Sequence, residues 1–330
     1  MQPERLSKHG MTLSEANRLL ELSRQARWSF PTSQGRPVSY GEPEEWVEKL
    51  DREREPLAKA VAFLMAIGRE DDAADLAARV WRLWVLAGEE EGGRRLLAPV
   101  LKVEPRRETK ALSLALYGDS LLAFRLGKLP ESRRAGERAM KVATSIGDSE
   151  ALVLANLALS RVDFEDGDLR QSLSHAKEAR RLAQSLAREY GQAPLFIEAS
   201  ATRMLGDYDR AASLFRESVG LNRMLENKRM IAAELSNLGF VEIHRDRVED
   251  AERSFAESDR VSGGSEPDDP YGQGMSLLAK AMLAFRKGET ADAKAFLSEA
   301  KSIFAKAGLE PGRDDKSEFD WLTQQLKKTG

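Results

Sequence analysis

Few side chains in this sequence are spaced as a metal site requires. The segment DFEDGD, residues 163–168, is as acidic as a calcium loop, but it lacks the alternating ligands and the distal bidentate Glu of such loops. The three histidines, His9, His175 and His244, share no spacing suited to one metal ion. We therefore predict a structural turn at 163–168 and no metal site.

Other kinds of chemistry are excluded by the residues and motifs that are missing. Cysteine is absent, which removes disulfides, thiolate nucleophiles and zinc–thiolate sites together. No G-x-x-x-x-G-K-[ST] loop is present to hold phosphates, and no helix-turn-helix is recognisable. No Ser/His/Asp or paired-carboxylate arrangement stands out by its spacing. We predict a non-catalytic protein with no catalytic residues and no cofactor.

The composition points to a helical globular chain. Of the 330 residues 42% are hydrophobic, 32% charged and only 7% aromatic, and Ala, Leu, Glu and Arg are helix formers. The net charge of −3, from interspersed charges, gives no general attraction to nucleic acid or to an anionic membrane. The longest apolar run, residues 60–68, is far below the ~20 residues of a membrane span. With a polar start and no cysteine, the sequence suggests a soluble, cytoplasmic protein, with direct nucleic-acid binding not expected.

A repeat with a period near forty organises the chain. Each copy is an amphipathic helix, a turn and a second amphipathic helix, and the turn residues are Gly88, Gly127, Gly167, Gly206, Asp246 and Gly288. Their spacings are 39, 40, 39, 40 and 42 residues. A glycine there can take the left-handed conformation that ends a helix without Cβ strain.

Small residues recur at fixed distances from these turns. Five residues later stand Gly93, Ser132, Ser172, Ala211, Ala251 and Ala293, and twelve later Val100, Ala139, Ala179, Ser218, Ser258 and Ala300. Seven residues earlier stand Trp81, Ser120, Ser160, Ala199, Gly239 and Ala281. All are small except Trp81 and Val100. Antiparallel helices approach closely only where small side chains meet, so these positions predict the helix crossings.

The pattern predicts an all-α fold, a right-handed α-solenoid of antiparallel helix pairs. It resembles the tetratricopeptide repeat from about Trp81 to Leu309, although the usual unit is about 34 residues long. We divide the chain into residues 1–43 (helix and loop), 44–103 (N-terminal repeats), 104–312 (the repeat array) and 313–330 (a capping helix). One helix over about 72–86 would have to serve the turns at both Gly68 and Gly88, and its pairing stays open.

The finer expectations outside the array concern helices and loops. We expect a helix over 14–27, a loop over 30–43, a helix from Glu44 that restarts at Pro56, a loop over 262–272 and a last helix over 316–327. Proline suits the first turn of a helix, where its missing N–H has no partner to lose.

The segment from Glu44 to Leu101 resembles the start of the C-terminal helical region of large ATP-dependent bacterial transcriptional regulators. These are the maltose-regulator, LuxR-type and antibiotic-regulatory proteins that carry a signal-transduction ATPase. The residues that carry the resemblance are Trp46, Leu50, Leu57, Ala60, Trp81, Trp84 and Gly88. The resemblance implies a region that senses an inducer or a partner, here without the ATPase and the DNA-binding domain.

The first helix of each pair should line the inner groove of such a solenoid. The candidate binding residues are Arg82, Tyr117, Phe124, Arg125, Arg161, Phe164, Phe196, Arg203, Phe240, His244, Phe285 and Arg286. Aromatic rings beside guanidinium groups suit a peptide or protein segment with acidic and apolar residues. Two alternatives stay open: the Phe residues pack between repeats while the Arg residues are merely solvated, or the groove receives a small effector molecule.

Overall fold

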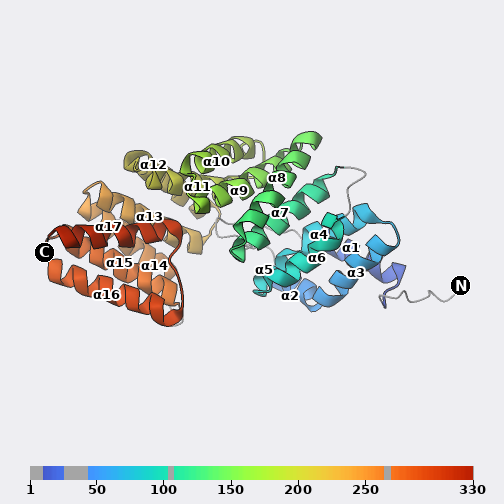
Figure 1. The fold of residues 1–330 in the computed structure, drawn as a ribbon, viewed down its shortest axis with the longest axis horizontal. Coiled ribbons are helices and arrows are strands. Elements are labelled where there is room, and N and C mark those ends of the chain that lie inside the picture. Colours follow the sequence, from blue (N-terminus) through green and yellow to red (C-terminus); the bar gives the residue numbers. More distant parts are fainter. Residues whose placement is uncertain (1–9, 26–43, 103–107, 264–268, 330) are drawn as a thin grey trace, which may run out of the picture. The chain divides into compact units, whose positions relative to one another are not determined.

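The structure, a computed structural model, describes residues 10–25, 44–102, 108–263 and 269–329, and within them every regular element is a helix (Figure 1). None of these helices combines the length and apolar character needed to cross a bilayer. The elements are α1 (Leu13–Gln25), α2 (Glu44–Arg52), α3 (Arg54–Ala66), α4 (Glu70–Val80), α5 (Arg82–Leu86), α6 (Glu90–Lys102), α7 (Lys110–Arg125), α8 (Leu129–Ile146), α9 (Ser149–Asp166), α10 (Leu169–Ala183), the short 3₁₀ helix η1 (Arg188–Gly191), α11 (Gln192–Met204), α12 (Tyr208–Met224), α13 (Lys228–His244), α14 (Val248–Ser262), α15 (Pro270–Arg286), α16 (Thr290–Ala307) and α17 (Arg313–Lys328).

The chain forms two compact units, and each is described by itself below. Unit 1 comprises Met1–Pro194 and unit 2 comprises Leu195–Gly330. The boundary falls inside the predicted repeat array, near the start of α11. The division at residues 43, 103 and 312 was made by repeat type and stays a prediction.

The predicted turns are confirmed. All six turn residues have a positive φ, from 60° at Asp246 to 89° at Gly167, and each stands between the two helices of a pair. Asp168 follows Gly167 and accepts a hydrogen bond from the backbone N–H of Gln171, so it caps α10. The acidic segment 163–168 is therefore a helix end and a structural turn, as predicted.

The small residues meet where the helices of a pair cross. In the pair α9–α10 the hydroxyls of Ser160 and Ser172 donate to each other's backbone carbonyls, at 2.8 and 2.9 Å. Ser120 and Ser132 repeat this exchange in the pair α7–α8, at 2.8 Å in both directions. A serine at these positions thus keeps the helices close and still satisfies its buried hydroxyl.

The N-terminal pairing that the sequence left open depends on a break at Trp81. Helix α4 ends before this residue and α5 begins after it, so α4 packs on α3 across the turn at Gly68 while α5 packs on α6. Trp81 is 1% exposed, and a Cβ added to Gly118 of α7 would lie 2.8 Å from its indole nitrogen. The large residue at a usually small position is therefore accommodated by a glycine on the neighbouring helix.

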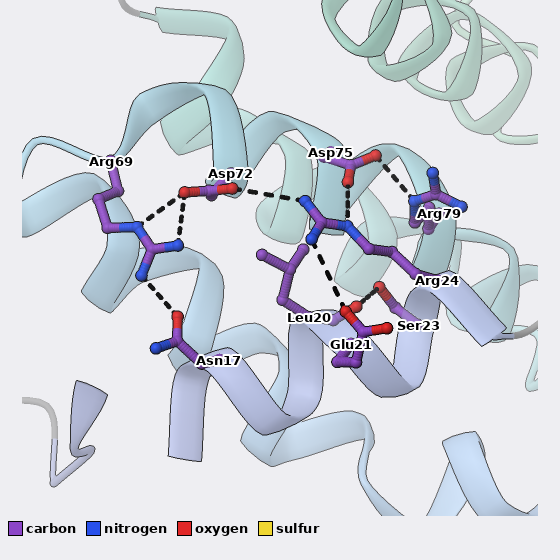
Figure 2. A network of polar contacts seen from close by, with 9 residues as sticks. All are labelled: Asn17, Leu20, Glu21, Ser23, Arg24, Arg69, Asp72, Asp75 and Arg79. Atoms are coloured by element: carbon purple, nitrogen blue, oxygen red, sulfur yellow. Dashed lines mark hydrogen bonds and ion pairs between the residues drawn. The ribbon is translucent and has the colours of Figure 1, made fainter. Parts of the chain in front are cut away.

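Helix α1 covers the first helix pair of unit 1. Leu19 and Leu20 are buried. Figure 2 shows ion pairs and a hydrogen bond between α1 and residues 69–79 on either side of Leu20. Arg24 bonds Asp75 of α4 at 3.0 Å, and Arg69 reaches Asn17 of α1 at 2.5 Å. Exposed pairs of this kind contribute up to about 1 kcal/mol each, so the apolar contacts decide the docking.

The remaining predicted helices are confirmed within the described residues. The helix predicted over 14–27 is α1, the helix from Glu44 restarts as α3 with Pro56 in its first turn, and the last helix is α17. The predicted loop at 30–43 lies outside the described residues. Of the predicted loop at 262–272, residues 264–268 also lie outside the described residues, while residues 270–272 are helical and form the first turn of α15.

Candidate functional site

In unit 1, three of the candidate residues gather around Trp81. The ring of Tyr117 meets the indole edge-on at 6.1 Å, and the guanidinium of Arg82 lies 4.6 Å from the indole centroid. Arg161 is 4% exposed and donates from Nη1 to the hydroxyl of Tyr117 at 3.1 Å. This cluster joins α5, α7 and α9, and its members are mostly buried.

The other three candidates of unit 1 lie apart from this cluster. Arg125 donates to Glu90 at 2.8 Å and so ties the end of α7 to the start of α6. Phe164 is buried at 9% exposure and Phe124 is half-buried. These positions fit packing between neighbouring helices at least as well as contact with a ligand.

In unit 2, four candidate residues gather on a surface that α17 covers. Arg203 comes from α11, His244 from the end of α13, and Phe285 and Arg286 from the end of α15. We call the surface formed by these residues, together with Asn237 and Tyr208, the inner face of unit 2. All four candidates lie on the first helices of their pairs, as predicted. Their coverage by α17 was not predicted from the sequence.

Arg203 is the centre of the inner face. Its side chain is 1% exposed and pairs with Asp314 of α17 at 2.8 Å, with Glu318 further away at 3.7 Å. Nη1 also donates to the amide oxygen of Asn237 at 2.9 Å. Burial acts to lower the pKa of Arg203, but the charges of Asp314 and Glu318 outweigh it and leave that pKa raised. The guanidinium is thus firmly cationic and needs carboxylates beside it.

His244 continues the same contact. Its Nε2 lies 2.6 Å from the carboxylate of Glu318, and its ring stacks on Tyr208 with centroids 4.5 Å apart. Trp321 of α17 meets the His244 ring edge-on at 4.7 Å. An imidazole between a carboxylate and two aromatic rings is held in one orientation.

Trp321 also reaches the α15 side of the inner face. It lies edge-on to Phe285 at 5.9 Å, and the guanidinium of Arg286 lies 5.3 Å from the indole centroid. Arg286 donates to the backbone carbonyl of Ile243 at 2.7 Å, so its head group is fixed over the ring. Such cation–π contacts contribute about 0.5–2 kcal/mol, depending on desolvation.

A second cluster holds the start of α17. The hydroxyl of Tyr271 donates to Asp315 at 2.6 Å and accepts from the backbone N–H of Gly312 at 3.1 Å. Burial, and next the charge of Asp314, raise the pKa of Asp315 to about 7. Three carboxylates lie within five residues of α17: Asp314 and Glu318 pair with Arg203, and Asp315 bonds Tyr271.

The last two candidates, Phe196 and Phe240, are packing residues. Phe240 is 1% exposed and meets Phe255 edge-on at 5.1 Å, while Phe196 meets Phe215 at 6.4 Å. Both contacts join the two helices of one pair, whereas the packing alternative placed the Phe residues between repeats. Its Arg part is wrong for Arg161 and Arg203, which are buried in polar contacts and not solvated.

Sequence reasoning missed the residues that face these candidates from α17. A spacing of four places Asp314, Glu318 and Leu322 on one helix face, and this mixed acidic and apolar face could have been noticed. No local signal, however, pairs residue 318 with residue 203, because such a contact depends on the complete fold.

A polar hollow of about 350 Å³ adjoins the inner face. It lies at the turns that follow α11 and α13 and includes the ring of His244 in its wall. Its lining residues are Gly206, Asp207, Tyr208, Asp209, His244, Arg245 and Arg247.

Comparison with known proteins identifies the fold class. No family model matches the chain, and no curated protein matches it either. A Rap protein solved in complex with the Competence and Sporulation Factor is 13% identical, with a TM-score of 0.55 over 86% of this chain and 80% of that one. The quorum sensor NprR from B. thuringiensis, in its apo form, is 14% identical, with a TM-score of 0.55 over 86% of this chain and 79% of that one.

A third solved structure is a signal transduction ATPase with numerous domains from Pyrococcus horikoshii, which carries a tetratricopeptide repeat sensor. It is 13% identical, with a TM-score of 0.56 over 87% of this chain and 48% of that one. Structural similarity at such low sequence identity shows the fold alone. The chain has the all-α fold of tetratricopeptide-like solenoids, built from antiparallel helix pairs.

Proposed function

We propose that the chain is a non-catalytic binding module that recognises a peptide or protein segment with acidic and apolar residues. The observation that carries the proposal is Arg203, a cation at 1% exposure whose neighbours in the fold are the carboxylates of a helix. A buried guanidinium is stable only with such partners, so the inner face selects ligands that bring carboxylates. The aromatic rings of His244, Tyr208 and Phe285 supply the apolar part of the contact.

We further propose that binding serves a regulatory system, with this chain as its sensing arm. Proteins of the same fold include a quorum sensor, a Rap protein that binds the Competence and Sporulation Factor, and a signal transduction ATPase with a tetratricopeptide repeat sensor. That shared use of the fold supports the idea that this chain transmits the presence of a ligand to a partner.

Selection from a displayed library of helical peptides tests the binding function. The immobilised full-length chain should enrich sequences with two carboxylates four residues apart and an aromatic residue nearby. A library in which every Asp and Glu is replaced by Asn and Gln is the matched control and should enrich nothing. A consensus of basic residues, or no enrichment, would contradict the proposal.

A receptor for a small polar effector is the second candidate, favoured by the hollow beside His244. Its volume of about 350 Å³ is within the range of small-molecule sites, about 300–1,000 Å³. Lined by Asp207, Tyr208 and Arg245 among others, it suits a polar molecule with both donors and acceptors. A thermal-shift screen of polar metabolites would support this function if a hit raised the melting temperature and lost its effect in Arg245→Ala.

A further inference from the structure

Helix α17 packs on α15 and α16 more sparsely than the two helices of a pair pack on each other. Its buried residues are Glu318, Phe319, Leu322 and Leu326, and the first of these carries a charge. This number matches the four buried residues of α16, the outer helix of its pair, whereas α13 buries eleven residues along its length. Helix α17 therefore lies on a surface that the other helices form, with its opposite side in solvent.

The contacts of α17 have the composition of a ligand bound to a site. Asp314 and Glu318 pair with Arg203, Glu318 also bonds His244, and Trp321 lies among His244, Phe285 and Arg286. Ser317 adds a contact to the sulfur of Met204 at 3.2 Å. These contacts come from α11, α13 and α15, which are first helices of three successive pairs. The acidic and apolar chemistry expected of a partner is present in the chain itself.

The apolar side of α17 closes the core of unit 2. Phe319 meets Phe304 of α16 edge-on at 5.6 Å, and Leu322 and Leu326 belong to the same buried cluster. Any segment that replaced α17 would have to supply apolar residues in this register. It would also have to bring carboxylates to Arg203, because a buried cation left alone is strongly unfavourable.

Exchange of α17 for a similar helix leaves the inner face satisfied. Each ion pair broken is replaced by an equivalent one, and the desolvation of Arg203 is the same before and after. The replacement is then governed by concentration, with α17 acting as a tethered competitor at an effective concentration of about millimolar. A segment without the carboxylates gains nothing from the exchange, which gives the site its specificity.

We propose that α17 is an internal ligand of the inner face of unit 2, and that the partner is an amphipathic helix that displaces it. The partner helix carries carboxylates at two positions four apart, matching Asp314 and Glu318, and an aromatic residue three positions further on, matching Trp321. Apolar residues stand at the positions of Phe319 and Leu322. This inference rests on the proposed function and names its site, its ligand class and its control.

The test uses the full-length chain and a labelled synthetic peptide of residues 309–330. In the chain variant Asp314→Asn with Glu318→Gln the internal helix is weakened, while the inner face is untouched. Fluorescence anisotropy should show this variant binding the native peptide at least about tenfold more tightly than the unaltered chain does, because breaking buried charge pairs favours displacement. A peptide with the same two amide replacements should not gain. The matched control, Asp320→Asn on the exposed side of α17, should behave as the unaltered chain.

A thiol reporter covers the case in which the double variant fails to fold. The chain has no cysteine, so Ser317→Cys gives a single thiol at the contact with Met204. Excess native peptide should raise the rate of maleimide labelling of that thiol severalfold, and the amide peptide should leave it unchanged.

The outcomes separate this inference from the proposed function. An unchanged labelling rate, or equal affinity of the native peptide for the double variant and the unaltered chain, overturns the internal-ligand inference. If library peptides still bind in that case, the binding function stands and its site lies elsewhere. If no peptide of either kind binds, the proposed function fails as well.

Discussion

Gly239 and Gly220 form a matched pair of helical glycines with opposite expected responses to alanine. Gly239 lies in α13 at a predicted helix crossing, and an added Cβ would stand 2.5 Å from Cε1 of Phe255. Gly220 lies in α12, and an added Cβ would meet nothing within 4 Å. Both substitutions bring the same gain in helix propensity, so their difference isolates the cost of the crossing.

The magnitude follows from how little the Phe255 ring can move. An ordinary contact is at least 3.4 Å, so the ring would have to shift by about 0.9 Å. It lies 5.1 Å from the ring of Phe240 and is 8% exposed, which leaves it no free space. Overpacking costs about 1–3 kcal/mol, and alanine regains about 1 kcal/mol of helix propensity. We expect Gly239→Ala to lower the free energy of unfolding by up to about 2 kcal/mol and Gly220→Ala to raise it by up to about 1 kcal/mol, so the two variants differ by about 1–3 kcal/mol.

Urea unfolding followed by far-UV circular dichroism measures both variants under one condition. The m-value should stay constant, so that a change in midpoint reports stability alone. If Gly239→Ala proved as stable as Gly220→Ala, the inference that small residues set the helix approach would be refuted.

Three further outcomes follow from the polar contacts. The folded pKa of Asp315, about 7, exceeds its ordinary value of 3.8, so this group lowers the free energy of unfolding as pH rises from about 4 to about 7. The variant Asp315→Asn should lack this pH dependence and should be more stable than the unaltered chain at pH ~8. Urea unfolding measured across this pH range tests both expectations. Ser160→Ala and Ser172→Ala should each lower the free energy of unfolding by about 1 kcal/mol. The double variant should lose less than the sum, because the two serines bond to each other. Strict additivity in a double-mutant cycle would contradict this coupling between the two serines. Arg203→Met should lower the free energy of unfolding by about 3–5 kcal/mol, because Asp314 and Glu318 lose their cation. Adding Asp314→Asn and Glu318→Gln to this variant should restore much of the lost stability. If the same unfolding assay showed no recovery, the packing of Arg203 would matter more than its charge.

The repeat was predictable from sequence because its determinants are local. A residue with positive φ ends the first helix of each pair, and the small residues lie at fixed distances from it along the same chain segment. Even the aspartate at position 246 adopts the left-handed conformation, with φ of 60°. The turn recurs in all six copies and the small residues recur with only Trp81 and Val100 as exceptions, so weak signals from the copies reinforce one another.

Trp81 shows where local reasoning ends. The sequence marks it as an exception to the rule of small residues, but the compensating glycine, Gly118, stands on a helix of the following pair. Which of the neighbouring residues yields space depends on how α4, α5 and α7 pack together. A pattern read along one repeat contains no information about that choice.

The residue types of the inner face could be predicted from the sequence, but their burial beneath α17 could not. Placing Arg203, His244 and Arg286 on the first helices required only the helical period and the turn positions. Their burial depends on α17, whose register against α11 and α13 arises from three-dimensional packing. The alternative that the arginines are merely solvated is therefore wrong at Arg203, whose partners Asp314 and Glu318 lie more than a hundred residues further along the chain.

The reliance of Arg203 on α17 also bears on the order in which unit 2 acquires its structure. Met204 and Ser317, which touch at this contact, are 113 residues apart, and contacts of such separation form late in folding. During synthesis α11 leaves the ribosome well before α17, so the guanidinium stays hydrated until α17 emerges. Unit 2 is therefore completed only after α17 has been translated, and a premature stop before residue 313 would leave an uncovered cationic surface on an unfinished domain.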